Sequence, residues 1–220
     1  MPLLDLIFPK TCLGCGKEGV YICSDCMDKM KLSGSICPYC EKASIDGITH
    51  TKCIRKFGLD GLASVWEYEG VVRKALIALK YKYATGVGRE IMYYLLPTLT
   101  KKFIPAASCL VPIPMFWYRQ NTRGFNQSAE VGKIISTYLK LGFEPDLLIR
   151  KKPTIPQVEL AGFARRRNLR GVFTVNSGLK LPDFVLLFDD VFTTGSTLME
   201  ATKVLKRAGV QKVWGLTIAR

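Results

Sequence analysis

Closely spaced pairs of cysteines are the most distinctive feature of the first quarter of the sequence. Seven of the eight cysteines lie before residue 54, in three C-x-x-C pairs and a fourth pair that begins with the only histidine. In a C-x-x-C turn both sulfurs lie on one side of a tight loop, and two such turns complete the tetrahedral shell that Zn²⁺ prefers. The predicted ligands are Cys12, Cys15, Cys23, Cys26, Cys37, Cys40, His50 and Cys53.

Zinc is favoured over disulfides because the first ten residues contain Asp5 and lack the basic start of a secretory signal, so we expect a cytoplasmic protein. Four ligands per ion leave no open position for water, which predicts two structural ions. Neighbouring pairs can share an ion, with 12–26 on one ion and 37–53 on the other, or the pairs can interleave. The entropy of loop closure differs little between these two arrangements, so it favours neither strongly. The spacing leaves His50 the least certain ligand.

A second group of residues suited to chemistry occupies positions 184–197. The adjacent carboxylates Asp189 and Asp190 follow an apolar run, where they can accept hydrogen bonds from vicinal hydroxyls and attract Mg²⁺. Small and hydroxylated residues come next and lead into a predicted helix, whose first N–H groups favour a phosphate. They are Thr193, Thr194, Gly195, Ser196 and Thr197. This order predicts a site for a ribose diol and its 5′-phosphate.

Positive charge is concentrated after the cysteine-rich region. The formal net charge is +14, of which residues 1–57 carry 8 − 6 = +2 and residues 58–220 carry 24 − 12 = +12. Such a surplus favours a phosphorylated metabolite or nucleic acid as partner, although a solvated basic face is the simpler alternative. The arginines that could bind such a partner are Arg119, Arg123, Arg165, Arg166 and Arg167.

The elements that must position these residues follow from composition and periodicity. With 220 residues and 48% hydrophobic side chains, the chain is an ordinary globular sequence. Apolar runs predict strands at 62–68, 108–112, 147–150, 171–175, 184–188 and 213–219. Helical spacing predicts helices at 70–81, 89–99, 127–141 and 197–208.

This alternation predicts an α/β domain with a mainly parallel sheet flanked by helices, which binds ligands beyond the carboxyl ends of its strands. We expect two domains, a small N-terminal zinc-ribbon module at 1–57 and the α/β domain at 58–220. No apolar run approaches the length of about 18 residues that a membrane helix needs, so we expect no membrane insertion.

The stretch 184–197 resembles the signature of type I phosphoribosyltransferases. Together with Val111-Pro-Ile-Pro114, Arg123-Gly-Phe-Asn-Gln127, Pro156-Gln157, the arginine-rich stretch 165–171 and the cysteine-rich start, it resembles the ComF family of competence proteins over nearly the whole chain. The resemblance implies that the two aspartates hold the ribose hydroxyls of 5-phosphoribosyl 1-diphosphate and that 193–197 hold its 5′-phosphate. It also implies a diphosphate-binding loop after Val111 and a mobile loop over the site at 151–167.

The resemblance predicts a Mg²⁺-dependent phosphoribosyltransferase that acts in DNA uptake and natural transformation together with other competence proteins. The alternatives are a non-enzymatic factor that binds single-stranded DNA, with Trp66, Trp117, Tyr118 or Phe125 as stacking platforms, and a sensor of phosphoribosyl diphosphate. Purine-type transferases often carry an acidic residue in the phosphate loop. Here uncharged residues occupy 192–194, so the acceptor is not predicted.

Overall fold

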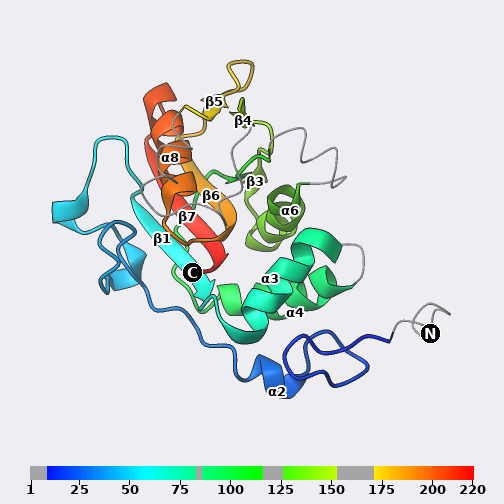
Figure 1. The fold of residues 1–220 in the computed structure, drawn as a ribbon. Helices are drawn as coiled ribbons and strands as arrows, with labels where there is room; N and C mark the ends of the chain where they lie inside the picture. Colours follow the sequence, from blue (N-terminus) through cyan, green and yellow to red (C-terminus); the bar gives the residue numbers. More distant parts are fainter. Residues whose placement is uncertain (1–8, 83–85, 116–125, 153–170) are drawn as a thin grey trace.

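A five-stranded sheet forms the centre of the computed structural model, which describes residues 9–82, 86–115, 126–152 and 171–220. All neighbouring strands in the sheet run parallel, in the order β1-β7-β6-β2-β3 (Figure 1). The strands are β1 (Gly61–Trp66), β2 (Cys109–Pro112), β3 (Gly142–Phe143), β6 (Phe184–Val191) and β7 (Lys212–Ala219). The predicted α/β fold with a mainly parallel sheet is confirmed.

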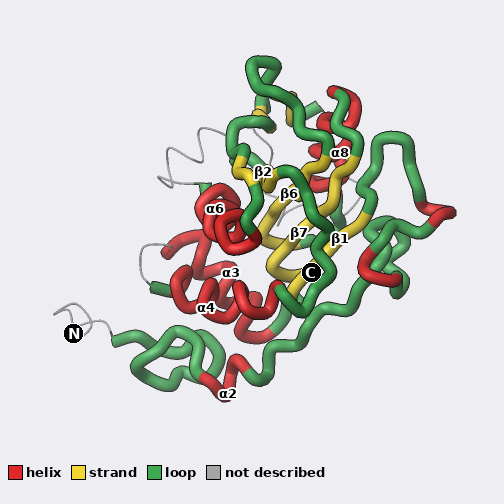
Figure 2. The backbone as a smooth tube through the Cα atoms, turned by 180° about the vertical axis from the view of Figure 1, so that it is seen from behind, coloured by secondary structure: helices red, strands yellow, loops and turns green. Residues whose placement is uncertain are grey.

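Helices cover both faces of this sheet (Figures 1 and 2). One face carries α3 (Gly70–Lys82), α4 (Val87–Leu99) and α6 (Gln127–Leu139), and the other carries α8 (Ser196–Ala208). The strands β4 (Leu148–Arg150) and β5 (Phe173–Val175) were predicted, but they pair antiparallel in a separate small sheet that contacts α8. Within the described ranges, no helix has both the length and the apolar character needed to cross a membrane.

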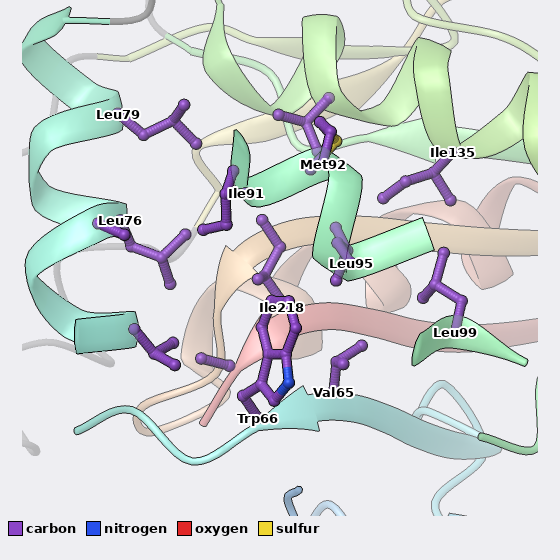
Figure 3. Close-up of a cluster of buried hydrophobic side chains, with 14 of the residues drawn as sticks. Val65, Trp66, Leu76, Leu79, Ile91, Met92, Leu95, Leu99, Ile135 and Ile218 are labelled. Carbon is purple, nitrogen blue, oxygen red and sulfur yellow. The ribbon is translucent and has the colours of Figure 1, made fainter. Parts of the chain in front are cut away.

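The alternation of side chains along β6 divides the core into two layers. Leu186 and Phe188 lie in the cluster beneath α3, α4 and α6, whereas Val185 and Leu187 lie in the cluster beneath α8. Figure 3 shows the first layer, where side chains of α3 and α4 meet those of β1 and β7. A strand buried on both faces is typical of parallel sheets, which explains why β6 is apolar until its last three residues.

The first part of the cysteine-rich region packs against the helical layer. It contains the short helix α2 (Ser24–Met27), and its buried residues Cys12 and Ile22 belong to the same core cluster as α3 and α4. The carboxylate of Glu90 on α4 accepts hydrogen bonds from the backbone N–H groups of Tyr21 and Ile22, at 2.8 and 2.9 Å. This part of the chain is therefore held by the helices as well as by its own turns.

The second part of the cysteine-rich region, with the 3₁₀ turns η1 (Ile45–Gly47) and η2 (Thr51–Cys53), lies along the edge strand β1 (Figure 2). Single antiparallel bridges join Ile48 to Gly61 and Leu32 to Trp66 at the two ends of β1. An exposed edge strand is a template for unwanted pairing, and these bridges cover both of its ends.

Candidate functional site

Asp189 and Asp190 lie at the carboxyl end of β6, in the last three residues of the strand. Asp189 is in register with Thr217 of β7, and both aspartates are partly exposed. The carboxyl ends of all five strands meet at this edge because the sheet is parallel. A side-chain oxygen of Asp189 accepts the backbone N–H of Asp190 at 2.9 Å, which holds the first carboxylate against the turn.

The loop that follows β6 brings the predicted phosphate-binding residues to the start of α8. Gly195 precedes the helix with a φ of +66°, a left-handed backbone conformation that residues with a side chain rarely adopt. The hydroxyls of Thr194 and Ser196 lie 2.8 Å apart, so the loop is braced across this glycine. Gly195, as the N-cap residue, has no side chain to cap α8, and the first turn of the helix contains no acidic residue. Its N-terminus is therefore suited to an anion.

Helix α6 adds two residues that the sequence reasoning did not single out. The hydroxyl of Ser128 donates to a carboxylate oxygen of Asp189 at 3.4 Å. Asn126 caps the helix by accepting the N–H of Ser128 at 3.2 Å, and its amide nitrogen donates to the carbonyl of Ile113, just beyond β2, at 3.4 Å. The motif 123–127 was noted for its arginine, whereas an asparagine before a helical pattern is the signal that could have placed α6 at this edge.

Several predicted residues lie outside the described residues. They are Arg119, Arg123, Arg165, Arg166 and Arg167, the aromatics Trp117, Tyr118 and Phe125, and most of the predicted covering loop. Trp66 is described, and its prediction as a stacking platform is wrong, because its side chain is only 3% exposed and lies in the core between β1 and the helices (Figure 3).

The eight predicted metal ligands come together in two groups of four. Cys12, Cys15, Cys23 and Cys26 form the first, and Cys37, Cys40, His50 and Cys53 form the second. Within each group the candidate ligand atoms all lie within 4.8 Å of one another, as a tetrahedral shell around one ion requires. The structure therefore favours neighbouring over interleaved pairs. The residues fit zinc, since thiolate and imidazole are its usual ligands in structural sites.

His50 is oriented as a metal-binding histidine would be. Its Nδ1 lies 3.3 Å from the sulfur of Cys40, and its Nε2 lies 3.1 Å from the carbonyl oxygen of Ala43. A histidine that donates one ring N–H to a carbonyl presents its other nitrogen as a lone pair, which is the arrangement around zinc. The ring is thus turned toward the other three ligands of its group.

The environment of the thiols also fits a cation. Burial opposes ionisation of Cys12, but hydrogen bonds from backbone N–H groups in the two turns outweigh it and lower its pKa to about 6. Similar backbone hydrogen bonds outweigh burial at Cys37 and lower its pKa to about 7. Burial and the neighbouring sulfurs raise the pKa of Cys26 to about 12 and that of Cys53 to about 11. In each group, a divalent ion would relieve the repulsion between neighbouring sulfurs and favour the thiolate form of the cysteines.

Comparison with known proteins supports the two metal-ligand groups and finds relatives over most of the chain. The family described as the double zinc ribbon domain matches residues 3–54. The chain is 36% identical over 116 residues to competence protein F of Haemophilus influenzae, a match that covers half of each chain. It is 28% identical over 203 residues to the DNA utilization protein YhgH of Salmonella typhi, covering 89% of both chains. It is also 28% identical over 210 residues to competence protein ComFC of Streptococcus pneumoniae, covering 90% of this chain and 87% of that one.

A solved structure of adenine phosphoribosyltransferase from Leishmania donovani is also similar, with 19% identity, 64% of this chain and 55% of that chain covered, and a TM-score of 0.36. Because this score is low, the fold class rests on the sheet order and its flanking helices. The resemblance to the ComF family is confirmed by the relatives named competence protein F, ComFC and YhgH and by the double zinc ribbon at its N-terminus.

Proposed function

We propose that the chain binds 5-phosphoribosyl 1-diphosphate with Mg²⁺ at the carboxyl edge of the sheet and transfers the phosphoribosyl group to an acceptor. The observation that carries this proposal is the position of Asp189 and Asp190, which lie in the last three residues of β6, one short loop before the N-terminus of α8. Carboxylates accept hydrogen bonds from both hydroxyls of a diol, and the helix N-terminus binds a phosphate ester. A ribose 5-phosphate carries both groups.

The residues at this edge have separate tasks in the proposed reaction. Asp189 and Asp190 orient the sugar through its hydroxyls, and Ser128 keeps Asp189 in place through the hydrogen bond described above. The loop 193–197 anchors the 5′-phosphate, so that the reacting carbon is held at a fixed position while the diphosphate departs. Mg²⁺, which part-exposed carboxylates can hold, would neutralise the negative charge that develops on the leaving group. Arg119, Arg123 and Arg165–Arg167 are proposed to bind the phosphates.

The cysteine-rich region, for which we propose the boundary 1–57, is structural in this scheme. Each group of four ligands described above would hold one Zn²⁺, with His50 as the single nitrogen ligand. Metal coordination can supply on the order of 10 kcal/mol of folding free energy to such a segment. The zinc ions would therefore fix the position of the chain against α4 and β1 rather than take part in the reaction.

We place this activity in the cytoplasmic handling of incoming DNA, in contact with competence proteins. The names of the relatives and the charge of +12 in residues 58–220 support that setting. The same observations favour a second candidate, a protein that binds single-stranded DNA without catalysis. For that candidate, a shallow dependence of DNA affinity on salt would count against contacts with phosphates.

The proposal is tested by titrating the protein with phosphoribosyl diphosphate in a calorimeter, with and without Mg²⁺. Binding should require Mg²⁺ and should be lost in the double variant Asp189→Asn/Asp190→Asn. The matched control is Asp183→Asn, because Asp183 is an exposed aspartate just before the opposite end of β6. Unchanged affinity in the double variant would refute the assignment of the two carboxylates.

A further inference from the structure

A cavity of about 450 Å³ lies between the second cysteine group and α8, next to the proposed phosphate-binding loop. One wall comes from the cysteine-rich region, through Tyr39 and the segment 55–58 that follows Cys53. The other wall comes from the first two turns of α8, through Ser196, Met199 and Lys203. The two walls are far apart in the sequence, so the cavity exists only because the second cysteine group is held beside α8.

The wall from the cysteine-rich region is aromatic and well held. The hydroxyl of Tyr39 accepts the backbone N–H of Leu59 at 2.8 Å, and the guanidinium of Arg55 lies over the tyrosine ring, 4.5 Å from its centroid. Gly58 allows this arrangement, since a Cβ at that position would overlap the tyrosine hydroxyl. Beside this ring, Phe57 adds a second aromatic side chain to the lining. A fixed aromatic wall favours a flat ligand that can stack.

Positive charge surrounds the aromatic wall. Arg55, Lys56 and Lys203 line the cavity, and the guanidinium of Arg207 lies 5.3 Å from the centroid of the Phe57 ring. Among the described lining residues only Glu200 is acidic. It accepts the N–H of Gly171 at 2.9 Å through one oxygen and lies 3.9 Å from the Lys203 amine through the other. Three lining cations against one lining carboxylate among the described residues leave an excess that favours an anion.

We infer that this cavity binds the base of a nucleotide whose phosphate lies at the N-terminus of α8. Ser196 carries the inference, because it belongs both to the cavity lining and to the first turn of α8. The position of the phosphate rests on the proposed function, whereas the aromatic and cationic walls do not. A stacking wall, a cationic rim and an adjoining phosphate site match a nucleoside phosphate, either free or as one unit of a single strand.

The site of the base is separate from the carboxylates that would hold the ribose of phosphoribosyl diphosphate. Asp189 is hydrogen-bonded to Ser128 of α6, and α6 and α8 pack against opposite faces of the sheet. The contribution of the base to nucleotide affinity should therefore remain when both carboxylates are replaced. This separation lets the two proposals fail independently.

The test compares thymidine 5′-monophosphate with 2-deoxyribose 5-phosphate, which lacks only the base, by calorimetry on the zinc-loaded full chain. The nucleotide should bind roughly fivefold to a hundredfold more tightly, as expected for stacking of one base on an aromatic side chain. Phe57→Ala should reduce this ratio toward one, and Phe57→Leu, which keeps apolar bulk, should do the same if the alanine variant does not fold. Tyr93→Ala is the matched control, since this tyrosine is 74% exposed on α4, away from the cavity lining.

The dinucleotide d(TpT) separates the two sources of the ligand. If thymidine monophosphate binds more tightly than 2-deoxyribose 5-phosphate, and this affinity ratio depends on Phe57, the site takes free nucleotides. If only d(TpT) shows it, the site takes a unit of a strand, and both results support the inference. A ratio near one for both ligands, or an equal ratio in Phe57→Leu and Tyr93→Ala, would overturn it. A ratio that persists in Asp189→Asn/Asp190→Asn, alongside no binding of phosphoribosyl diphosphate to the unmodified chain, would refute the proposed function alone.

Discussion

Replacing Gly195 by alanine should destabilise the protein through two separable effects at the candidate phosphate site. The φ of +66° costs an alanine about 1–2 kcal/mol relative to its preferred conformations. The added Cβ would also lie 2.5 Å from two carbons of the Phe192 ring and 3.1 Å from the methyl carbon of Met199. Phe192 is only 3% exposed, so its ring has little room to move, and overpacking of this kind costs about 1–3 kcal/mol. The sum is about 2–5 kcal/mol.

The assay is thermal unfolding of the zinc-loaded chain, compared between variants under the same conditions. For a chain of this size each kcal/mol lowers Tm by about 2–4 °C, so Gly195→Ala should lower it by roughly 4–20 °C. Gly171→Ala is the matched control, since its φ is +67° and a Cβ there would meet no heavy atom of the described residues within 4 Å. That variant should lose only the backbone part, about 2–8 °C.

The difference between the two glycine variants isolates the contact with Phe192. The double variant Gly195→Ala/Phe192→Leu should recover part of that difference, as a double-mutant cycle would show. Equal losses of Tm in the two glycine variants would refute the reasoning, because they would mean that the loop accepts a methyl group without moving the ring. The proposed function predicts a rise in Tm with phosphoribosyl diphosphate and Mg²⁺, and Gly195→Ala should abolish it, since the altered loop would no longer fit the phosphate.

Three further changes have defined outcomes. Glu90→Ala leaves the backbone N–H groups of Tyr21 and Ile22 without their carboxylate and should lower stability by about 2 kcal/mol in thermal unfolding, whereas an unchanged Tm would show that water replaces the carboxylate. His50→Ala should reduce bound zinc from two ions per chain to one in metal analysis, and retention of both would exclude His50 as a required ligand. Burial, aided by Glu144, raises the pKa of the Cys109 thiol to about 11 from 9.0, so its stabilising contribution is complete below pH 9 and is lost between about pH 9 and 11. Cys109→Ala should therefore flatten the fall of Tm over that pH window. An unchanged slope of Tm against pH would contradict the raised pKa of Cys109.

Local patterns in the sequence were enough to predict most of the elements and the residues suited to chemistry. The helices and strands around the sheet were predicted because their apolar residues recur with the period of each element. The spacing of the cysteines predicted metal ligands because a C-x-x-C turn is a local structure. The position of Asp189 and Asp190 after a strand could likewise be read from the apolar run that precedes them.

Features that depend on contacts between distant residues could not be predicted in this way. The two-residue strand β3 has no periodic signal, and β4 and β5 looked like members of the main sheet because pairing partners are not encoded locally. Trp66 has the same aromatic side chain whether it lies in a core or on a surface, and only the packing of α3 and α4 over β1 decided that it is buried.

The sequence by itself determined the types of the metal ligands, the alternation of strands and helices, and the position of the paired aspartates just before the hydroxyl-rich loop, because each depends on residues within about one element of one another. Only the tertiary structure decided that neighbouring cysteine pairs form the two groups, that Ser128 supports Asp189, and that Tyr39 and Phe57 lie beside α8. The physical reason is that these contacts join segments between 8 and about 160 residues apart, whose encounter is set by burial of the whole sheet rather than by local preference.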